Sequence, residues 1–259
     1  MASSTIIAGL SSTPWLAGVK PNVRANLRLF CFPYAGGGAT IFRTWQSELP
    51  QEVEVCPVQL PGRGRRLKEA AFTNVHTLVV ELAQGLFPFL GKPFAFFGHS
   101  MGAAISFELA RYLRREHHLM PRRLFVSGRR APHLPAMHDP TYNLPDPEFL
   151  VALRDLNGTP HEALEQPDLM ELMLPLLRAD FELSETYTYL KGPRLDCPMS
   201  IYGGEEDVEV PREHLDAWGE MTTGSVSLKI FPGDHFFVNT AQTALLRTLS
   251  QELKQMSLI

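Results

Sequence analysis

The stretch FAFFGHSMG, residues 94–102, decides the fold of this chain. Its first four residues are apolar and predict a strand that is buried on both faces. G-x-S-x-G follows, and an apolar helical pattern begins at Ala103. On such a strand-to-helix turn a serine is held in a strained backbone conformation with its hydroxyl exposed, and flanking glycines avoid collisions. The stretch therefore predicts a nucleophile elbow at Ser100, against the plainer alternative of a serine that caps a helix.

Composition limits the class of protein. Of 259 residues, 44% are hydrophobic and 20% are charged, so the chain can bury a large core. The formal net charge of -4 argues against a general nucleic-acid binder, and no apolar run is long enough to span a membrane. The three cysteines have no metal-ligand spacing, and their odd number fits a reducing compartment. We expect a cytoplasmic protein without a metal site.

Strand and helix patterns alternate along most of the chain. Residues 1–26 lack the features of a signal peptide and are expected to form a loose leader. Strand patterns cover residues 27–32, 53–58, 94–97, 124–127, 198–203 and 226–231. Helical patterns cover about 40–49, 74–90, 103–110, 211–218 and a final segment from 237. This alternation predicts an α/β fold with a mainly parallel sheet and right-handed crossovers.

The alternation fails between about residues 133 and 191. This stretch is rich in proline and contains two helix candidates, near 146–156 and 168–190. Because no strand separates them, we favour a helical lid that lines a substrate channel over ordinary core helices. The second candidate is rich in Leu and Met, and Met suits adaptable surfaces. The predicted organisation is one domain over 27–259 with a lid insertion at 133–191.

A serine nucleophile needs a neutral histidine to take its proton and an acid to orient that histidine. In hydrolases with this elbow, the acid and then the histidine follow the serine in the chain, on loops at the carboxyl ends of parallel strands. His235 lies in a glycine-containing loop directly after the last strand, whereas His214 falls inside a predicted helix. We therefore predict His235 as the base that serves Ser100.

The acid is expected in the loop after the preceding strand. Asp207 lies there, with Glu205 and Glu206 as alternatives. Asp234 is adjacent to His235, and a neighbouring residue can rarely reach back to the Nδ1 of that ring. We predict Asp207.

A tetrahedral intermediate also needs backbone N–H donors for its oxyanion. One donor is expected from Met101, the residue after the nucleophile. The second is expected from the loop after the first strand, where we assign Ala35 with Gly36 as its competitor. The glycine run 36–38 belongs to neither G-x-G-x-x-G nor a Walker motif, so a dinucleotide site is rejected.

Taken together, several stretches resemble the type II thioesterases that serve polyketide and non-ribosomal peptide synthases, within the α/β-hydrolase superfamily. They are LRLFCFPYAGGG, PVQLPGRGRR, FFGHSMG, VSGRRAPHLP, YGGEEDVEV and FPGDHFF. The resemblance runs from about Arg28 to the final helix. It places the catalytic triad on Ser100, Asp207 and His235, and the oxyanion hole on Ala35 and Met101.

The resemblance also implies a substrate. Type II thioesterases hydrolyse acyl groups from the phosphopantetheine arm of acyl or peptidyl carrier proteins and so remove stalled or wrongly primed chains. The chain is then a monomer that needs no cofactor of its own. Because the carrier and its phosphate are anionic, we expect a local basic patch despite the acidic balance. The candidates are Arg63, Arg65, Arg66, Arg129 and Arg130.

Three alternatives stay open at this point. The same triad can transfer the acyl group to a second carrier instead of to water. A generic esterase or lipase can share the fold, because fold alone does not fix chemistry. The chain can also be a carrier-binding module without catalysis.

Overall fold

The computed structural model describes residues 13–19, 22–158 and 165–257 of the chain. Six strands form one parallel sheet in the order β2-β1-β3-β4-β5-β6. The strands are β1 (Leu27–Phe32), β2 (Val53–Pro57), β3 (Phe94–His99), β4 (Leu124–Ser127), β5 (Met199–Gly204) and β6 (Val226–Phe231). The predicted α/β fold with a parallel sheet is confirmed. The chain runs from β1 to β2 and then crosses β1 to reach β3, so the topological switch point lies between β1 and β3.

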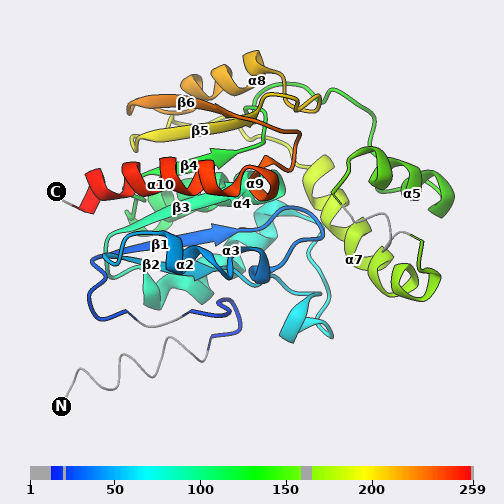
Figure 1. The fold of residues 1–259 in the computed structure, drawn as a ribbon, viewed down its shortest axis with the longest axis horizontal. Coiled ribbons are helices and arrows are strands. Elements are labelled where there is room, and N and C mark those ends of the chain that lie inside the picture. Colours follow the sequence, from blue (N-terminus) through cyan, green and yellow to red (C-terminus); the bar gives the residue numbers. More distant parts are fainter. Residues whose placement is uncertain (1–12, 20–21, 159–164, 258–259) are drawn as a thin grey trace.

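Helices cover both faces of the sheet (Figure 1). They are α2 (Trp45–Glu48), α3 (Val75–Leu86), α4 (Met101–His117), α8 (Arg212–Asp216), α9 (Phe237–Thr240) and α10 (Gln242–Ser257). Asn74 begins α3 as predicted, because its side-chain oxygen accepts hydrogen bonds from the backbone N–H groups of His76 and Thr77 at 2.9 and 3.1 Å.

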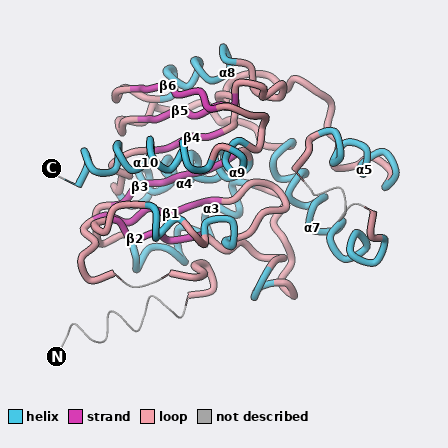
Figure 2. The backbone as a smooth tube through the Cα atoms, viewed as in Figure 1, coloured by secondary structure: helices cyan, strands magenta, loops and turns pink. Residues whose placement is uncertain are grey.

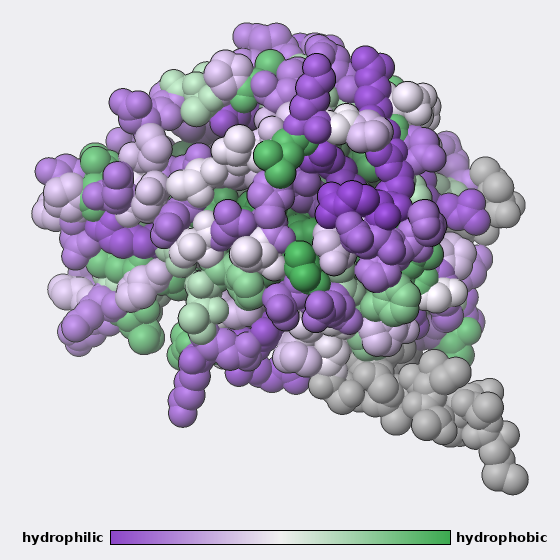
Figure 3. All heavy atoms as spheres, turned by 180° about the vertical axis from the view of Figure 1, so that it is seen from behind, coloured by the Kyte–Doolittle hydropathy of each residue, from purple (hydrophilic) through white to green (hydrophobic). Residues whose placement is uncertain are grey.

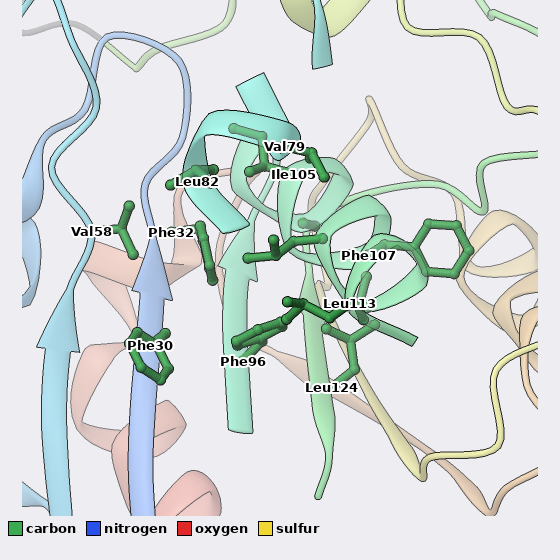
Figure 4. Packing of buried hydrophobic residues seen from close by; sticks show 14 of the residues in the cluster. Phe30, Phe32, Val58, Val79, Leu82, Phe96, Ile105, Phe107, Leu113 and Leu124 are labelled. Carbon is green, nitrogen blue, oxygen red and sulfur yellow. The ribbon is translucent and has the colours of Figure 1, made fainter. Parts of the chain in front are cut away.

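The central strands are buried on both faces, as their apolar runs predict. Alternate side chains point to opposite sides of a strand. Phe30 and Phe96 therefore join a core with α3 and α4 (Figure 4), whereas Cys31 and Phe97 join a second core with α2 and α10. Two separate hydrophobic layers hold the sheet in place.

The segment predicted as one helix at 40–49 forms two short pieces, a 3-10 turn at Ala39–Phe42 and then α2. A 3-10 turn brings residues three apart to the same side of the chain. Phe42 and Trp45 have this spacing; both are buried, with ring centroids 4.9 Å apart. The C-terminal helix is likewise divided at Ala241, which leaves helical geometry.

The segment before β1 differs in part from the predicted loose leader. Residues 1–12 lie outside the described residues. Trp15 and Leu16, however, are buried in the core beside α3, and Leu16 forms an antiparallel bridge with Val58. The guanidinium of Arg66 lies 4.1 Å from the centroid of the Trp15 ring. The expectation is corrected for this stretch, because its large apolar side chains complete the core.

Two further helices, α5 (Asp146–Asp155) and α7 (Pro167–Glu185), occur between β4 and β5 in the chain. They stand away from the layered body, on the right of Figures 1 and 2. Both predicted helices are confirmed, although α7 ends at Glu185 and not at residue 190. Their buried side chains form a small core of their own around Phe149 and Met170.

The surface seen from behind is largely hydrophilic, with hydrophobic residues in small groups between polar ones (Figure 3). In the part of the chain that the structure describes, no helix has both the length and the apolar character needed to cross a bilayer.

Candidate active site

Ser100 occupies a sharp turn between β3 and α4, beside the topological switch point. Its backbone has φ 52° and ψ −114°, a conformation that side-chain-bearing residues rarely adopt. The flanking glycines are required by contact. A Cβ on Gly98 would lie 2.2 Å from the carbonyl oxygen of Gly102, and one on Gly102 would lie 2.2 Å from that of Phe32. The local geometry is that of the elbow that the sequence predicts.

The structure brings Ser100, His235 and Asp207 together. His235 Nε2 lies 3.0 Å from Ser100 Oγ, and His235 Nδ1 lies 2.9 Å from Asp207 Oδ2. The Asp207 side chain is fully buried, and its second oxygen accepts the Glu209 N–H at 3.0 Å. A carboxylate only accepts, so Nδ1 carries a proton toward Asp207 and Nε2 can accept the serine proton.

The alternative acids lie elsewhere. Asp234 Oδ2 accepts the side-chain amide of Asn157 at 3.0 Å, and its Oδ1 accepts the Phe236 N–H at 2.8 Å. Glu205 and Glu206 are exposed. Among these carboxylates, Asp207 contacts the His235 ring.

His99 is a residue of the site that sequence reasoning missed. It is fully buried, its Nε2 lies 2.9 Å from the His235 carbonyl oxygen, and its Nδ1 lies 2.8 Å from Ser127 Oγ. Because a carbonyl only accepts, Nε2 donates and Nδ1 accepts from Ser127. Burial, and then the proximity of His235, hold the pKa of His99 well below its usual value. The sequence feature that could have pointed to His99 is its position inside the GHSMG motif.

The two predicted oxyanion donors are the backbone N–H groups of Met101 and Ala35. Met101 is the first residue of α4, where the N–H has no partner in the helix. Ala35 lies in the loop after β1 and lines the same cavity as Ser100. Within the described residues its N–H has no hydrogen-bond partner. The N–H of the competitor, Gly36, already donates to Asp180 Oδ2 at 2.7 Å.

A cavity of about 430 Å³ extends from Ser100 and His235 into the space under α5 and α7. Its apolar wall comes from the body and from both helices, through Tyr34, Phe236, Met137, Leu153, Leu177 and Phe181. A cavity of this size and character fits an apolar chain attached to a reacting carbonyl.

Two of the five predicted carrier-binding arginines are inside the protein. Arg63 and Arg66 are 6% and 7% exposed. Arg63 Nη2 donates to Asp180 Oδ1 at 2.6 Å, and Arg66 Nη2 donates to Glu69 Oε2 at 2.6 Å. The prediction is wrong for Arg63 and Arg66, because each guanidinium is paired with a carboxylate of the protein itself. Arg65 is exposed.

Arg129 and Arg130 both line the cavity. Arg129 donates to Ser184 Oγ at 2.6 Å and to the Ser184 carbonyl oxygen at 2.9 Å, which ties the body to α7. Burial, followed by the nearby charge of Arg130, lowers the pKa of Arg129 to about 10. Arg130 is half-buried and has no hydrogen-bond or ion-pair partner among the described residues. Arg130 thus gives the cavity a positive charge that has no ion-pair partner in the part of the chain that the structure describes.

Several known proteins are similar to this chain over nearly its whole length. Linear gramicidin dehydrogenase LgrE of Brevibacillus parabrevis is 45% identical over 248 residues, 95% of this chain and 94% of that protein. RedJ, a thioesterase from the prodiginine biosynthetic pathway in Streptomyces coelicolor, has a TM-score of 0.84 and 40% identity, covering 90% of this chain and 92% of RedJ. BorB, a type II thioesterase from the borrelidin biosynthetic cluster, has a TM-score of 0.84 and 33% identity, covering 92% and 97%.

The thioesterase domain family model matches residues 27–253, which span every strand of the sheet, α5, α7 and the loops that carry Ser100, Asp207 and His235. This extent agrees with the resemblance that the motifs indicate. The chain belongs to the thioesterase family.

Proposed function

We propose that this protein is a serine thioesterase that hydrolyses acyl thioesters from the phosphopantetheine arm of carrier proteins in polyketide or non-ribosomal peptide biosynthesis. The observation that carries the proposal is the hydrogen-bonded series Ser100–His235–Asp207 at the base of an apolar cavity. Membership of the thioesterase family supports the reaction class. The names of RedJ and BorB, thioesterases of a biosynthetic pathway and a biosynthetic cluster, support a place in such a pathway.

The geometry suits a two-step reaction. The Ser100 hydroxyl gives its proton to His235 Nε2 while Oγ attacks the thioester carbonyl carbon. The oxyanion that forms accepts hydrogen bonds from the Ala35 and Met101 N–H groups. The C–S bond then breaks, and His235 returns the proton to the departing pantetheine sulfur, which leaves an acyl-serine.

Water completes the cycle. His235 takes a proton from a water molecule, whose oxygen attacks the acyl carbon through the same oxyanion site. Collapse of this intermediate releases the free acid and restores the Ser100 hydroxyl. Asp207 stays ionised throughout and stabilises the imidazolium.

The segment 133–191 acts as a lid in this proposal. Its helices supply one wall of the cavity, through Leu153, Leu177 and Phe181. An acyl chain held there is shielded from water until the reaction occurs. The basic groups left to receive the anionic arm or the carrier are Arg65, Arg129 and Arg130.

The name of LgrE denotes a dehydrogenase, but this chain has neither G-x-G-x-x-G nor a Walker motif. Its three cysteines are free and buried, which supports a reducing compartment such as the cytoplasm. We propose that the protein works there as a monomer.

The test is intact-mass spectrometry of carrier proteins loaded with different acyl chains, before and after incubation with the protein. We expect loss of the acyl mass and release of free acid. Replacement of Ser100→Ala should reduce the rate at least about 10³-fold. Addition of a free holo-carrier distinguishes transfer from hydrolysis, because acyl gain by that carrier would reject the hydrolase. Equal hydrolysis of a matched oxygen ester would indicate a generic esterase.

A further inference from the structure

Asp180 is a buried carboxylate on α7 that the proposed reaction does not use. It is 1% exposed, and within the described residues its oxygens accept hydrogen bonds from Gly36 and Arg63, which both belong to the body of the protein. Arg63 donates Nη2 to Oδ1 at 2.6 Å and Nη1 to Oδ2 at 2.8 Å, a bidentate pair. Arg63 belongs to the PGRGRR loop, a motif that the sequence singles out and that the carrier-binding hypothesis does not explain.

The Asp180–Arg63 pair forms hydrogen bonds with the loop that carries Ala35. Asp180 Oδ2 accepts the Gly36 N–H at 2.7 Å, and Arg63 Nη1 donates to the Gly37 carbonyl oxygen at 2.8 Å. The Gly37 N–H closes the loop by donating to the Tyr34 carbonyl oxygen at 2.9 Å. The Gly36 N–H is therefore fixed by a side chain from α7, and the Gly37 carbonyl is fixed by the arginine that pairs with that side chain.

Apolar packing also brings α7 close to Gly36 in the loop after β1. Gly36 has φ +76°, and a Cβ there would lie 2.7 Å from Leu177 Cδ2. Leu177 and Asp180 are three residues apart in α7, so they lie on the same side of the helix. Gly36 is thus next to two side chains of α7, the apolar Leu177 and the charged Asp180.

We propose that Asp180, oriented by Arg63, is a positioning residue that sets the oxyanion donor of Ala35 when α7 is seated on the body. Asp180 occupies the Gly36 N–H, the competing donor, and thereby leaves the Ala35 N–H to face the reacting carbonyl. The inference rests on the oxyanion hole of the proposed function. It means that the lid helix not only covers the acyl chain but also completes the reaction centre.

The alternative is an ion pair that only holds the fold together. A buried pair often contributes little net stability compared with apolar residues of similar size, so burial alone does not decide between the two roles. What separates them is the reactivity of Ser100 in a protein that remains folded.

The first experiment compares Asp180→Asn with Asp146→Asn. Asp146 also forms an ion pair with α7, with Arg178 at 2.5 Å, but among the described residues it forms no hydrogen bond with the loop after β1. The first readout is kcat and KM on an acyl carrier. The second is the rate at which a fluorophosphonate labels Ser100, because the P=O group of this reagent needs the same N–H donors as the oxyanion of the substrate. We expect Asp180→Asn to lower kcat and the labelling rate roughly 10- to 100-fold with little change in KM, and Asp146→Asn to leave both rates unchanged.

Because Asp180→Asn leaves the Arg63 charge buried, a double variant guards against misfolding. Arg63→Met with Asp180→Leu removes both charges and should keep a melting temperature close to that of the unaltered protein. It still removes the acceptor of the Gly36 N–H, so labelling of Ser100 should remain slow. A folded double variant that labels at the original rate would overturn the inference. Equal loss in the Asp146→Asn control would also overturn it.

The two proposals can fail separately. If the unaltered protein labels at Ser100 but hydrolyses no acyl carrier, the proposed function is wrong, and the labelling rates still decide the role of Asp180. If it hydrolyses acyl carriers and the Asp180→Asn protein labels and hydrolyses equally well, only the inference about Asp180 is wrong.

Discussion

The body of the molecule and the proposed lid, which carries α5 and α7, differ in how they are packed. In the body, the sheet lies between two extensive cores, and the Ser100, His235 and Asp207 side chains come from loops at strand ends. In the lid, α5 and α7 share a small core, while Val151 and Leu172 are 49% and 61% exposed. The comparison indicates that the reacting side chains are attached to the more stable body, whereas one wall of the acyl cavity belongs to the less stable α5–α7 segment.

The largest expected contrast comes from removing one buried ring in each region. Phe97 packs against Trp45 with ring centroids 4.8 Å apart, and Phe149 packs against Phe181 at 5.3 Å. Phe97→Ala should lower the global free energy of unfolding by about 3–5 kcal/mol, measured by urea denaturation. Phe149→Ala should lower it less, because it removes contacts only within the lid. Limited proteolysis of Phe149→Ala should instead show faster cleavage within residues 133–191.

A control and a contrary result are available. Val151→Ala alters an exposed position of α5 and should change neither stability nor cleavage. If Phe149→Ala reduces the global free energy of unfolding as much as Phe97→Ala does, the lid and the body unfold as one unit, and the distinction between them is wrong.

A smaller effect is expected where the cavity meets the anionic arm. Arg130→Gln should raise KM for an acyl carrier about 10-fold or more, because a charge-assisted hydrogen bond contributes roughly 1.5–3 kcal/mol. Stability should not change, since Arg130 has no partner among the described residues. Steady-state kinetics with an acyl N-acetylcysteamine thioester, which lacks the phosphate, separates the two ends of the substrate. With this substrate we expect no change in KM.

Arg43→Gln is the matched control, because Arg43 is exposed and does not line the cavity. An equal rise in KM for both substrates would show that Arg130 acts on the acyl group. No rise for the carrier would exclude Arg130 from carrier recognition.

The parts of the fold that sequence reasoning predicted are encoded locally. An apolar run that is bounded by a turn predicts β1 and β3, and the glycines beside Ser100 predict the elbow without knowledge of distant residues. The order of Ser100, Asp207 and His235 along the chain, together with their places after strands, favoured them over His214, Glu205 and Glu206, because parallel strands place their carboxyl ends at one edge. Each of these inferences needs only short stretches and one topological rule.

The parts that it missed depend on contacts between distant residues. Arg63 reads as a surface charge until Asp180, 117 residues later, is seen to neutralise it. Trp15 reads as part of a leader until the core beside α3 is known. His99 lies inside the GHSMG motif, but nothing near it in the sequence identifies its partner, a backbone carbonyl 136 residues away. Pairing of this kind leaves no local pattern.

The smallest effect is expected for pH, and it also tests the comparison between body and lid. His99 is neutral in the folded state because burial lowers its pKa, whereas in the unfolded chain it takes up a proton below about pH 6.5. The unfolded state therefore binds more protons as pH falls, and stability is lost. This loss should be at most about 1.4 kcal/mol per pH unit.

Urea denaturation of the unaltered protein and of His99→Gln at pH 7.5, 6.5 and 5.5 measures this contribution, since the other titrating groups are common to both. The stability advantage of the unaltered protein should shrink as pH falls below about 6.5. His138 is exposed, and His138→Gln serves as the control substitution of an exposed histidine. A pH-independent difference for His99→Gln would mean that the imidazole beneath His235 is not held neutral. The hydrogen bonds of His99 to the His235 carbonyl and to Ser127 would then not explain how His235 is placed beside Ser100.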